Sequence, residues 1–375
     1  FRLLCAEYGA HMVYSEELVD RSIASCRRSL SACGRVEYRN PGGKLIFSTI
    51  PHERVAFQLG TASGPDALAA ANVVADDVRA LDVNMGCPVK FSTQGGMGSA
   101  LLTQPERIRD ILTTLVRNFG GRRAVTCKIR ILDSFPKTLE LVRLIESCGV
   151  DAVAVHCRRV TDRPRFWAQW DVMRDLRAAI PTSLPLLLNG DVFSLADANR
   201  AVEMTRANGL MLARGALWNP ALFARDETKL VTQASLVSRY ISLAEQVENH
   251  VGNTKYVALQ MLDSHGKTQA FKALCSAKDY SDLRSAASAM KDEAVFCRPP
   301  RLPLTLEPPP DLPELAALPS NAWRTVPMHC KSALAHRSCG KPGADVAEVP
   351  LPKDPPAKRI RREEATDCVR EPEHR

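Results

Sequence analysis

The residue in this sequence that is best suited to chemistry is Cys87, which lies in the run NMGCP at residues 84–88. Residues 95–98 read GGMG, and glycines permit backbone conformations closed to other residues and allow a ligand to approach the main chain. A thiol with an ordinary pKa of about 8.5 is mostly protonated at neutral pH, so it can give a proton to a developing carbanion. We therefore take Cys87 as the candidate catalytic acid, against the alternative of a buried, inert cysteine.

Polar and titratable side chains also end most of the apolar runs along the chain. In TIM-type barrels the functional groups gather at the carboxyl ends of the strands, and the loops after the last two strands often hold a phosphate. Flavin mononucleotide has such a phosphate and a polar ring edge, although a sugar phosphate would also fit. The candidate cofactor-binding residues are Gln58, Lys128, His156, Asn189, Gly190, Asp191, Ala213 and Arg214.

The elements that must position these residues are short apolar runs that alternate with longer helical segments. Nearly continuous hydrophobic strands joined by helices indicate a parallel sheet that is covered on both faces. We expect helices at 63–78, 105–118, 139–148, 170–179 and 195–206, and strands at 11–16, 55–60, 81–85, 124–129, 152–156, 184–190 and 209–214.

Seven such strands favour a TIM-type (β/α)8 barrel that lacks its first strand, because a closed barrel needs eight. Residues 1–9 read as a helix that leads into the first visible strand, so we expect the missing strand to lie upstream. The competing fold is an open doubly wound sheet. That fold should carry a G-x-G-x-x-G turn after an early strand, and the sequence has none. The pattern therefore favours the barrel.

Composition divides the chain into three predicted parts. Residues 1–225 form the barrel, and residues 226–290 a helical domain with helices at 231–247, 254–262 and 269–284. Residues 291–375 hold more than half of the 25 prolines and are predicted to be disordered. The basic run KRIRR at 358–362 is either a solvated charge cluster, a nuclear-import signal or a nonspecific RNA contact.

Charge and cysteine content limit the class of protein. The net charge is +8 with a pI near 8.9, which suits a polyanionic partner but is equally compatible with a mildly basic enzyme. The 12 cysteines form no regular framework, so we expect reduced thiols and a cytoplasmic protein, with the nucleus as the alternative. Cys330, His336 and Cys339 match no standard zinc spacing, so we expect no metal.

No apolar run is long enough to span a membrane. The sequence begins at Phe1 without an initiator Met and without a recognisable signal peptide, so we expect a fragment or an incomplete gene model.

An ordered series of motifs resembles the tRNA-dihydrouridine synthase family. It comprises YSEELVD (14–20), NMGCP (84–88), STQGGMGSALL (92–102), TCKIR (126–130), AVHCRR (154–159), LNGDV (188–192), LARGALWNP (212–220) and NTKYVALQML (253–262). The series is most similar to the eukaryotic branch that acts at position 20 of the D-loop. The resemblance extends from residue 1 to about residue 262.

The resemblance implies FMN as cofactor, NADPH as reductant and a uridine in tRNA as substrate. Cys87 would protonate uracil C5 while the reduced flavin delivers hydride to C6. Gln58, Lys128 and His156 would contact the flavin ring or ribityl chain, and the remaining candidates would hold its phosphate. Asn84, Arg158 and Lys255 would contact a target base extruded from the tRNA, and the helical domain would bind the tRNA of a monomeric enzyme.

Three departures from the family pattern keep alternatives open. The first strand with its APM-type segment is missing before residue 1, Cys157 stands where glycine is usual, and no double-stranded-RNA-binding domain is recognisable in the tail. The alternatives are a non-catalytic RNA-binding homologue and another FMN barrel enzyme that acts on a small molecule. Flavin absorbance would argue against the first, and reduction of bulk tRNA against the second.

Overall fold

The computed structural model describes residues 1–162, 166–224, 231–262, 268–290 and 295–296. The predicted disordered tail, with its basic run at 358–362 and with Cys330, His336 and Cys339, lies outside the described residues.

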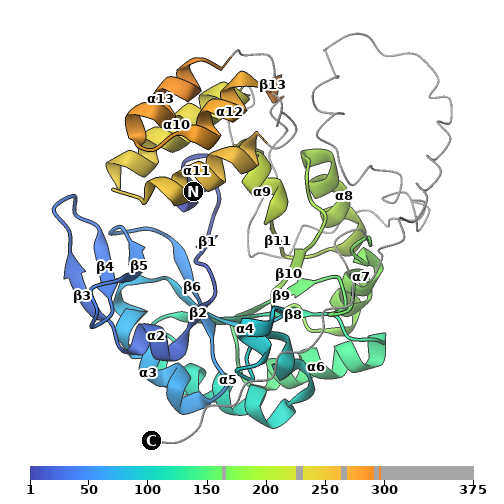
Figure 1. The fold of residues 1–375 in the computed structure, drawn as a ribbon. Helices are drawn as coiled ribbons and strands as arrows, with labels where there is room; N and C mark the ends of the chain where they lie inside the picture. The colour runs from blue at the N-terminus through green and yellow to red at the C-terminus, as the bar shows by residue number, and fades with distance from the viewer. Residues whose placement is uncertain (163–165, 225–230, 263–267, 291–294, 297–375) are drawn as a thin grey trace, which may run out of the picture. The chain divides into compact units, whose positions relative to one another are not determined.

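The centre of the fold is an eight-stranded parallel sheet surrounded by helices (Figure 1). Its order is β1-β6-β7-β8-β9-β10-β11, and β2 also pairs with β6. The strands are β1 (Val13–Tyr14), β2 (Leu18–Val19), β6 (Val55–Gly60), β7 (Ala80–Met85), β8 (Ala124–Arg130), β9 (Ala152–His156), β10 (Leu186–Asn189) and β11 (Gly209–Met211).

All seven predicted strands are present, but the first differs from its prediction. In place of one strand at 11–16, β1 and β2 are two short segments that pair in turn with β6, at Val13–Val55 and Leu18–Leu59. β10 and β11 are shorter than predicted because the chain turns into loops after Asn189 and Met211.

The sheet has the topology of a TIM-type barrel with one strand position open. β1 and β11 stand at the two ends of the strand order, and no strand among the described residues pairs with both of them. Neighbouring strands are parallel throughout, and a helix lies between most successive strands, as a barrel requires. The predicted fold class is confirmed.

The outer helices are α3 (Gly64–Val74), α5 (Pro105–Phe119), α6 (Phe135–Ser147), α7 (Trp170–Ala179) and α8 (Leu195–Thr205), all close to their predicted positions. Local sequence explains where they begin. Ser63 caps α3 by accepting a hydrogen bond from the Asp66 amide, and Ser194 forms a capping box with Asp197 at the start of α8. In α5 the buried Ile108, Ile111, Leu112 and Leu115 follow helical spacing and face the sheet.

The interior of the barrel is polar along β6, β7 and β8. In β7 the apolar Leu81, Val83 and Met85 belong to the hydrophobic core, whereas Asp82 and Asn84 alternate with them and point to the other face. The strand register places Asp82 beside Thr126 of β8 and Gln58 of β6. Side chains that the sequence separates by tens of residues thus meet inside the barrel.

A small antiparallel sheet, inserted between β2 and β6, was not predicted from the sequence. It contains β3 (Arg27–Leu30), β4 (Val36–Arg39) and β5 (Leu45–Thr49). Gly34 and Gly43 make the two tight turns, each at φ +78°. All four residues of β3 are exposed, so the strand carries no apolar alternation that would have predicted it.

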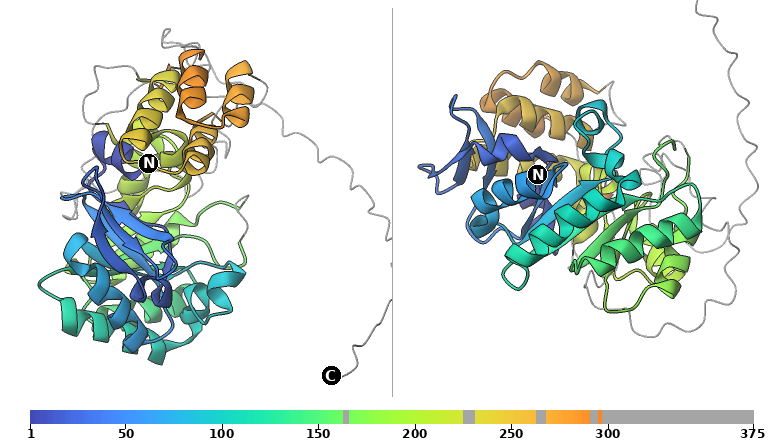
Figure 2. Two further views of the ribbon diagram at one scale, coloured as in Figure 1. Left: turned by 60° about the vertical axis from the view of Figure 1, so that its left-hand side comes forward. Right: turned by 90° about the horizontal axis from the view of Figure 1, so that it is seen from below.

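A second hydrophobic core is built by α10 (Gln233–Gln246), α11 (Val251–Met261), α12 (Gln269–Ser276) and α13 (Tyr280–Ser288) (Figures 1 and 2). Leu4 of α1 (Arg2–Glu7) belongs to this core, although we had placed residues 1–9 with the barrel. The boundaries of the predicted parts stay predictions. No helix of the described chain is both long and apolar enough to cross a membrane.

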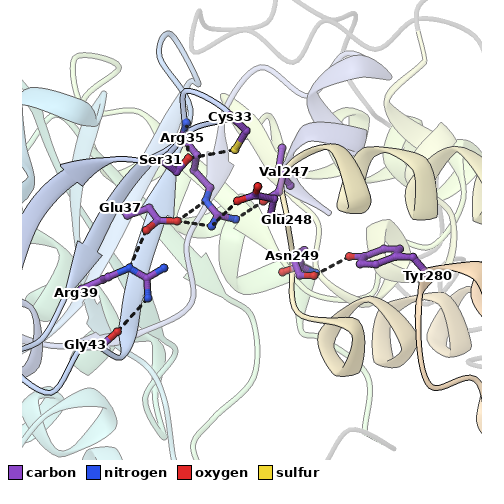
Figure 3. A network of polar contacts seen from close by, with 10 residues as sticks. All are labelled: Ser31, Cys33, Arg35, Glu37, Arg39, Gly43, Val247, Glu248, Asn249 and Tyr280. Carbon is purple, nitrogen blue, oxygen red and sulfur yellow. Dashed lines mark hydrogen bonds and ion pairs between the residues drawn. The ribbon is translucent and has the colours of Figure 1, made fainter.

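A buried arginine connects the inserted sheet with the end of α10 (Figure 3). The Arg35 guanidinium donates to the Glu37 carboxylate and to the Val247 carbonyl oxygen. Glu37 also accepts from Arg39 Nε at 2.8 Å. Arg35 and Glu37 are both buried, so this ion pair is shielded from solvent.

Candidate active site at the mouth of the barrel

The carboxyl ends of the strands bring the predicted site residues together. In the parallel register Asn84 lies beside Lys128, and His156 lies beside Asn189. Two adjoining cavities, of about 730 and about 410 Å³, reach this edge and share Pro88, Arg130, Asn189 and Ala213 in their walls. The smaller one also extends to Ala80, Ala124 and Gly209 at the amino ends of their strands. The larger is lined by His156, Gly190, Asp191 and Arg214, and the smaller by Gln58, Asn84, Cys87 and Lys128.

The segment that carries Cys87 is held by specific main-chain contacts. The Asn84 Oδ1 atom accepts hydrogen bonds from the amides of Gly86 and Cys87, each at 3.0 Å. The Ser99 amide donates to the Cys87 carbonyl oxygen at 2.9 Å. Gly98 has φ +57°, and a Cβ there would lie 2.6 Å from that carbonyl oxygen, so a larger residue would displace the segment.

Cys87 is half-buried, and its surroundings keep the thiol protonated. Burial raises its pKa most, and the nearby Glu17 carboxylate raises it further, while hydrogen bonds from Val89 and Ser92 act in the opposite direction. Ser92 Oγ donates to Glu17 Oε1 at 2.7 Å. Glu17 lies directly over Gly60, where a Cβ would come within 2.9 Å of its carboxylate oxygen. Glu17 and Ser92 were absent from the predicted site.

Lys128 presents an ammonium group to the smaller cavity. Among the described residues it has no hydrogen-bond partner, although it sits in the barrel wall. Burial and the neighbouring Arg130 lower its pKa to about 8, while Asp82 and Cys87 act against this shift. The group is therefore mostly charged at neutral pH and is available to a ligand.

His156 lies in a strongly positive environment. Burial and the four cations Lys128, Arg130, Arg158 and Arg214 lower its pKa to about 2, so the imidazole is neutral. Its Nε2 atom lies 3.3 Å from Arg158 Nη1. Such a concentration of cations at one mouth favours an anionic ligand.

Asp191 holds two of these arginines. Its carboxylate accepts from Arg158 at 2.6 Å, from Arg214 at 2.9 Å and from the Ala168 amide at 2.7 Å. The carboxylate thereby orients Arg214, which also stacks 5.0 Å over Phe193. The contact of Asp191 with a phosphate stays a prediction.

Gly190 and Asn189 shape the neighbouring wall. Gly190 has φ +120°, and a Cβ there would lie 2.8 Å from the Ala168 Cβ and 3.2 Å from the His156 ring. Asn189 Nδ2 donates to the Met211 carbonyl oxygen at 2.7 Å, which ties β10 to β11 at the mouth.

Two of the predicted substrate contacts have partners within the protein. Lys255 lies in α11, where its ammonium donates to the carbonyl oxygens of Cys275 and Ala277 at 3.1 and 2.9 Å. It thus caps the end of α12. Arg158 lines the larger cavity, where it is almost fully buried and bound to Asp191. The substrate contacts of both residues stay predictions.

Cys157 does not crowd its loop. It is fully buried, its amide donates to the Asn189 carbonyl oxygen at 3.0 Å, and burial raises its pKa to about 12. The side chain packs into the core like a small hydrophobic residue.

The fold and the site define a class of protein: a TIM-type barrel whose cation-rich mouth adjoins a half-buried thiol. Residues 1–301 match the family model described as dihydrouridine synthase, and the chain belongs to that family.

Three curated relatives support this assignment. The chain is 34% identical over 295 residues to the tRNA-dihydrouridine(20) synthase (NAD(P)+) of Schizosaccharomyces pombe, covering 76% of this chain and 61% of that protein. It is 30% identical over 311 residues to the Saccharomyces cerevisiae protein of the same name, covering 78% and 80%. It is 32% identical over 229 residues to the S. pombe tRNA-dihydrouridine(20a/20b) synthase (NAD(P)+), covering 60% and 65%. The chain thus spans less than two thirds of the length of the first and third of these relatives.

Proposed function

We propose that this protein is an FMN-dependent tRNA-dihydrouridine synthase that reduces a uridine of the D-loop, at position 20, with electrons from NADPH. The observation that carries the proposal is the meeting of a protonated thiol, Cys87, and an unpartnered ammonium, Lys128, in the wall of one cavity of the described chain. Family membership and the names of the relatives support the uridine as substrate.

The residues at the mouth fit FMN. The larger cavity is lined by Arg214 and the loop of Asn189, Gly190 and Asp191, which suit the phosphate end. Lys128 can donate to a polar ring atom, and Gln58 keeps one amide N–H after its bond to Asp82. When bound and reduced, FMN supplies the hydride that is added to uracil C6.

The protein supplies the proton and the position of the base. The C5–C6 double bond of uracil is replaced by two C–H bonds, one at C6 from the hydride and one at C5 from the Cys87 thiol. Cys87 is left as a thiolate and takes a new proton from solvent. Because burial and Glu17 raise its pKa, the thiol is protonated at neutral pH, as a proton donor must be. Asn84 keeps one amide N–H that can orient the uracil ring.

A direct test is the reduction of unmodified tRNA transcript by the purified chain with FMN and NADPH, read as dihydrouridine content. We expect dihydrouridine at one D-loop position. Flavin binding without dihydrouridine would favour an enzyme that acts on a small molecule. A chain that binds tRNA but no flavin would be a non-catalytic homologue. A cytoplasmic location and a monomeric state remain predictions.

A further inference from the structure

A buried carboxylate inside the barrel has no role in the site described so far. Asp82, in the middle of β7, has no exposed surface and lines neither cavity. Its Oδ1 atom accepts from Thr126 Oγ1 at 2.6 Å, and its Oδ2 atom accepts from Gln58 Nε2 at 2.8 Å. Burying a carboxylate is costly unless it is hydrogen-bonded, so these two donors define its contacts.

The hydrogen bonds continue from Asp82 to the main chain at Cys87. Gln58 Oε1 accepts from Asn84 Nδ2 at 2.9 Å. Asn84 Oδ1 in turn accepts from the amides of Gly86 and Cys87, each at 3.0 Å. Three side chains from two neighbouring strands therefore connect the barrel interior to the proton-donating residue.

The groups at the two ends of this series of hydrogen bonds determine how the side-chain amides of Gln58 and Asn84 are oriented. A side-chain amide has one donor end and one acceptor end. The Asp82 carboxylate offers only acceptors, while the main-chain amides of Gly86 and Cys87 offer only donors. Turning Gln58 around would set its oxygen against the Asp82 carboxylate and its nitrogen against the Asn84 nitrogen. Only one orientation of both amides satisfies every bond.

We propose that Asp82 is a positioning residue for Cys87: it fixes the orientation of Gln58 and Asn84, so that the Asn84 carbonyl holds the Gly86 and Cys87 amides. Asp82 thereby sets where the thiol stands in the cavity wall without touching substrate or flavin. The inference rests on the proposed function for what the thiol does there, but not for the hydrogen bonds themselves.

The charges around Asp82 are consistent with this role. Burial raises the pKa of Asp82 above its ordinary value, and the bonds from Thr126 and Gln58 and the charge of Lys128 oppose this rise. Tyr14 also faces this group, and burial and Asp82 both raise the pKa of its phenol, which therefore stays protonated. The donors to Asp82 thus come from β6 and β8, and the phenol of Tyr14 faces it from β1.

The test exchanges the carboxylate at position 82 with the side-chain amide at position 84. Asn84→Asp places acceptors on both sides of Gln58, which has only one donor end. In the double variant Asp82→Asn/Asn84→Asp every bond can form again with Gln58 reversed, because the new side-chain amide at position 82 then donates to Gln58 and still accepts from Thr126. Each variant of the full chain is studied by thermal unfolding and by hydrogen exchange of the Gly86 and Cys87 amides. Neither measurement needs flavin or tRNA, so the result is independent of the proposed activity.

We expect Asp82→Asn to lower the melting temperature and to speed exchange at Gly86 and Cys87 by about fivefold, the effect of losing one net hydrogen bond. In the Asn84→Asp background the same substitution should raise the melting temperature and return the exchange to within about twofold of the wild-type rate. Thr126→Val is the matched control, because it removes a donor from Asp82 on the side away from Cys87. It should lower the melting temperature and leave exchange at Cys87 unchanged.

Additive losses in the double variant would show that Asp82 and Asn84 are not coupled and would overturn the proposal. So would unchanged exchange at Cys87 in Asp82→Asn, since Asp82 would then support only the barrel. If Asn84→Asp does not fold, Gln58→Met, which cuts the series at its centre, replaces it. In that background Asp82→Asn should no longer affect exchange at Cys87. A persisting effect would contradict the proposal that Asp82 acts on Cys87 through Gln58.

Discussion

At the scale of single residues, the proposed reaction depends on the protonation state of Cys87. A proton donor must hold its proton at the working pH, and burial together with Glu17 raises the Cys87 pKa. A thiol whose pKa is raised stays protonated over a wider pH range and forms thiolate only at higher pH. Glu17 thus favours the acid form that the proposed reaction needs, and it discourages accidental alkylation or oxidation of the thiol.

Replacing Glu17 by Gln should lower the Cys87 pKa, because it removes a negative charge that disfavours the thiolate. The pH profile of Cys87 alkylation by iodoacetamide, followed on the Cys87 peptide by mass spectrometry, should move down by roughly half a unit to one unit. Peptide resolution is needed because Cys33 and Cys275 are exposed. Glu16→Gln is the matched control, since Glu16 is exposed and has no part in the Cys87 shift. Equal profiles for all three proteins would remove Glu17 from the account.

Replacing Lys128 by Met should weaken flavin binding, because it removes the ammonium that has no other partner among the described residues. A lost hydrogen bond to a charged group lowers affinity by about tenfold to a hundredfold. Flavin absorbance that stays with the protein after gel filtration, together with a fluorescence titration, measures the loss. Lys44→Met changes an exposed lysine of the inserted sheet and should bind flavin as before. Retained flavin in Lys128→Met would contradict the orientation we assign to the ring.

The sequence predicted the site residues that end strands, because the alternation of apolar runs and helices shows where those strands end. Cys87, Lys128 and His156 are examples. The sequence marked Glu17 only as one of the polar residues that end apolar runs, and it could not predict the role of Asp82, which depends on partners on neighbouring strands. The sequence also could not show that Lys255 donates to the carbonyl oxygens at the end of α12, because that contact joins two helices.

At the scale of elements, the strands with continuous apolar runs were the most predictable. The inserted sheet was missed because β3 is exposed throughout and β4 combines buried Val36 and Tyr38 with a buried ion pair. The first strand of the described sheet is divided into β1 and β2, and between them Ser15 Oγ accepts from the Gln58 amide at 2.8 Å. Such tertiary contacts leave little trace in local sequence.

Replacing Arg35 by Met should destabilise the fold by about 3 kcal/mol at pH 7, because it leaves a buried carboxylate with one partner fewer. The pKa of Glu37 is lowered because the bonds from Arg35 and Arg39 outweigh the opposing effect of burial. The stabilisation from Glu37 is therefore complete above pH 4.5, its ordinary pKa, and is lost as pH falls through the lowered value. Urea unfolding should show a difference from wild type that shrinks at low pH.

Arg174→Met is the control for Arg35→Met, since Arg174 is an exposed arginine whose partners are Asp171 and Asp175 on its own helix. It should cost less than about 0.5 kcal/mol. A difference between Arg35→Met and wild type that does not change with pH would mean that the bond to the Val247 carbonyl, and not the ion pair, provides the stabilisation.

At the scale of the whole molecule, a cluster of cations and a thiol lie together at the carboxyl ends of the barrel strands in the described chain. Lys128, Arg130, Arg158 and Arg214 provide the positive charge, with Asp191 as the acid that holds the last two. The thiol stands in the adjoining cavity. Tyr14 of β1 and Met211 of β11, the two strands at the ends of the strand order, both line this cavity.

The measurement that tests the proposed role of Cys87 most directly is a single-turnover experiment with the Cys87→Ala variant. The FMN-loaded protein is reduced anaerobically, mixed with unmodified tRNA, and followed by flavin reoxidation and by dihydrouridine formed. We expect Cys87→Ala to bind flavin and tRNA like the wild type but to reoxidise its flavin about 100-fold to 10,000-fold more slowly. Equal rates in the two proteins would show that the proton comes from elsewhere and would contradict the account.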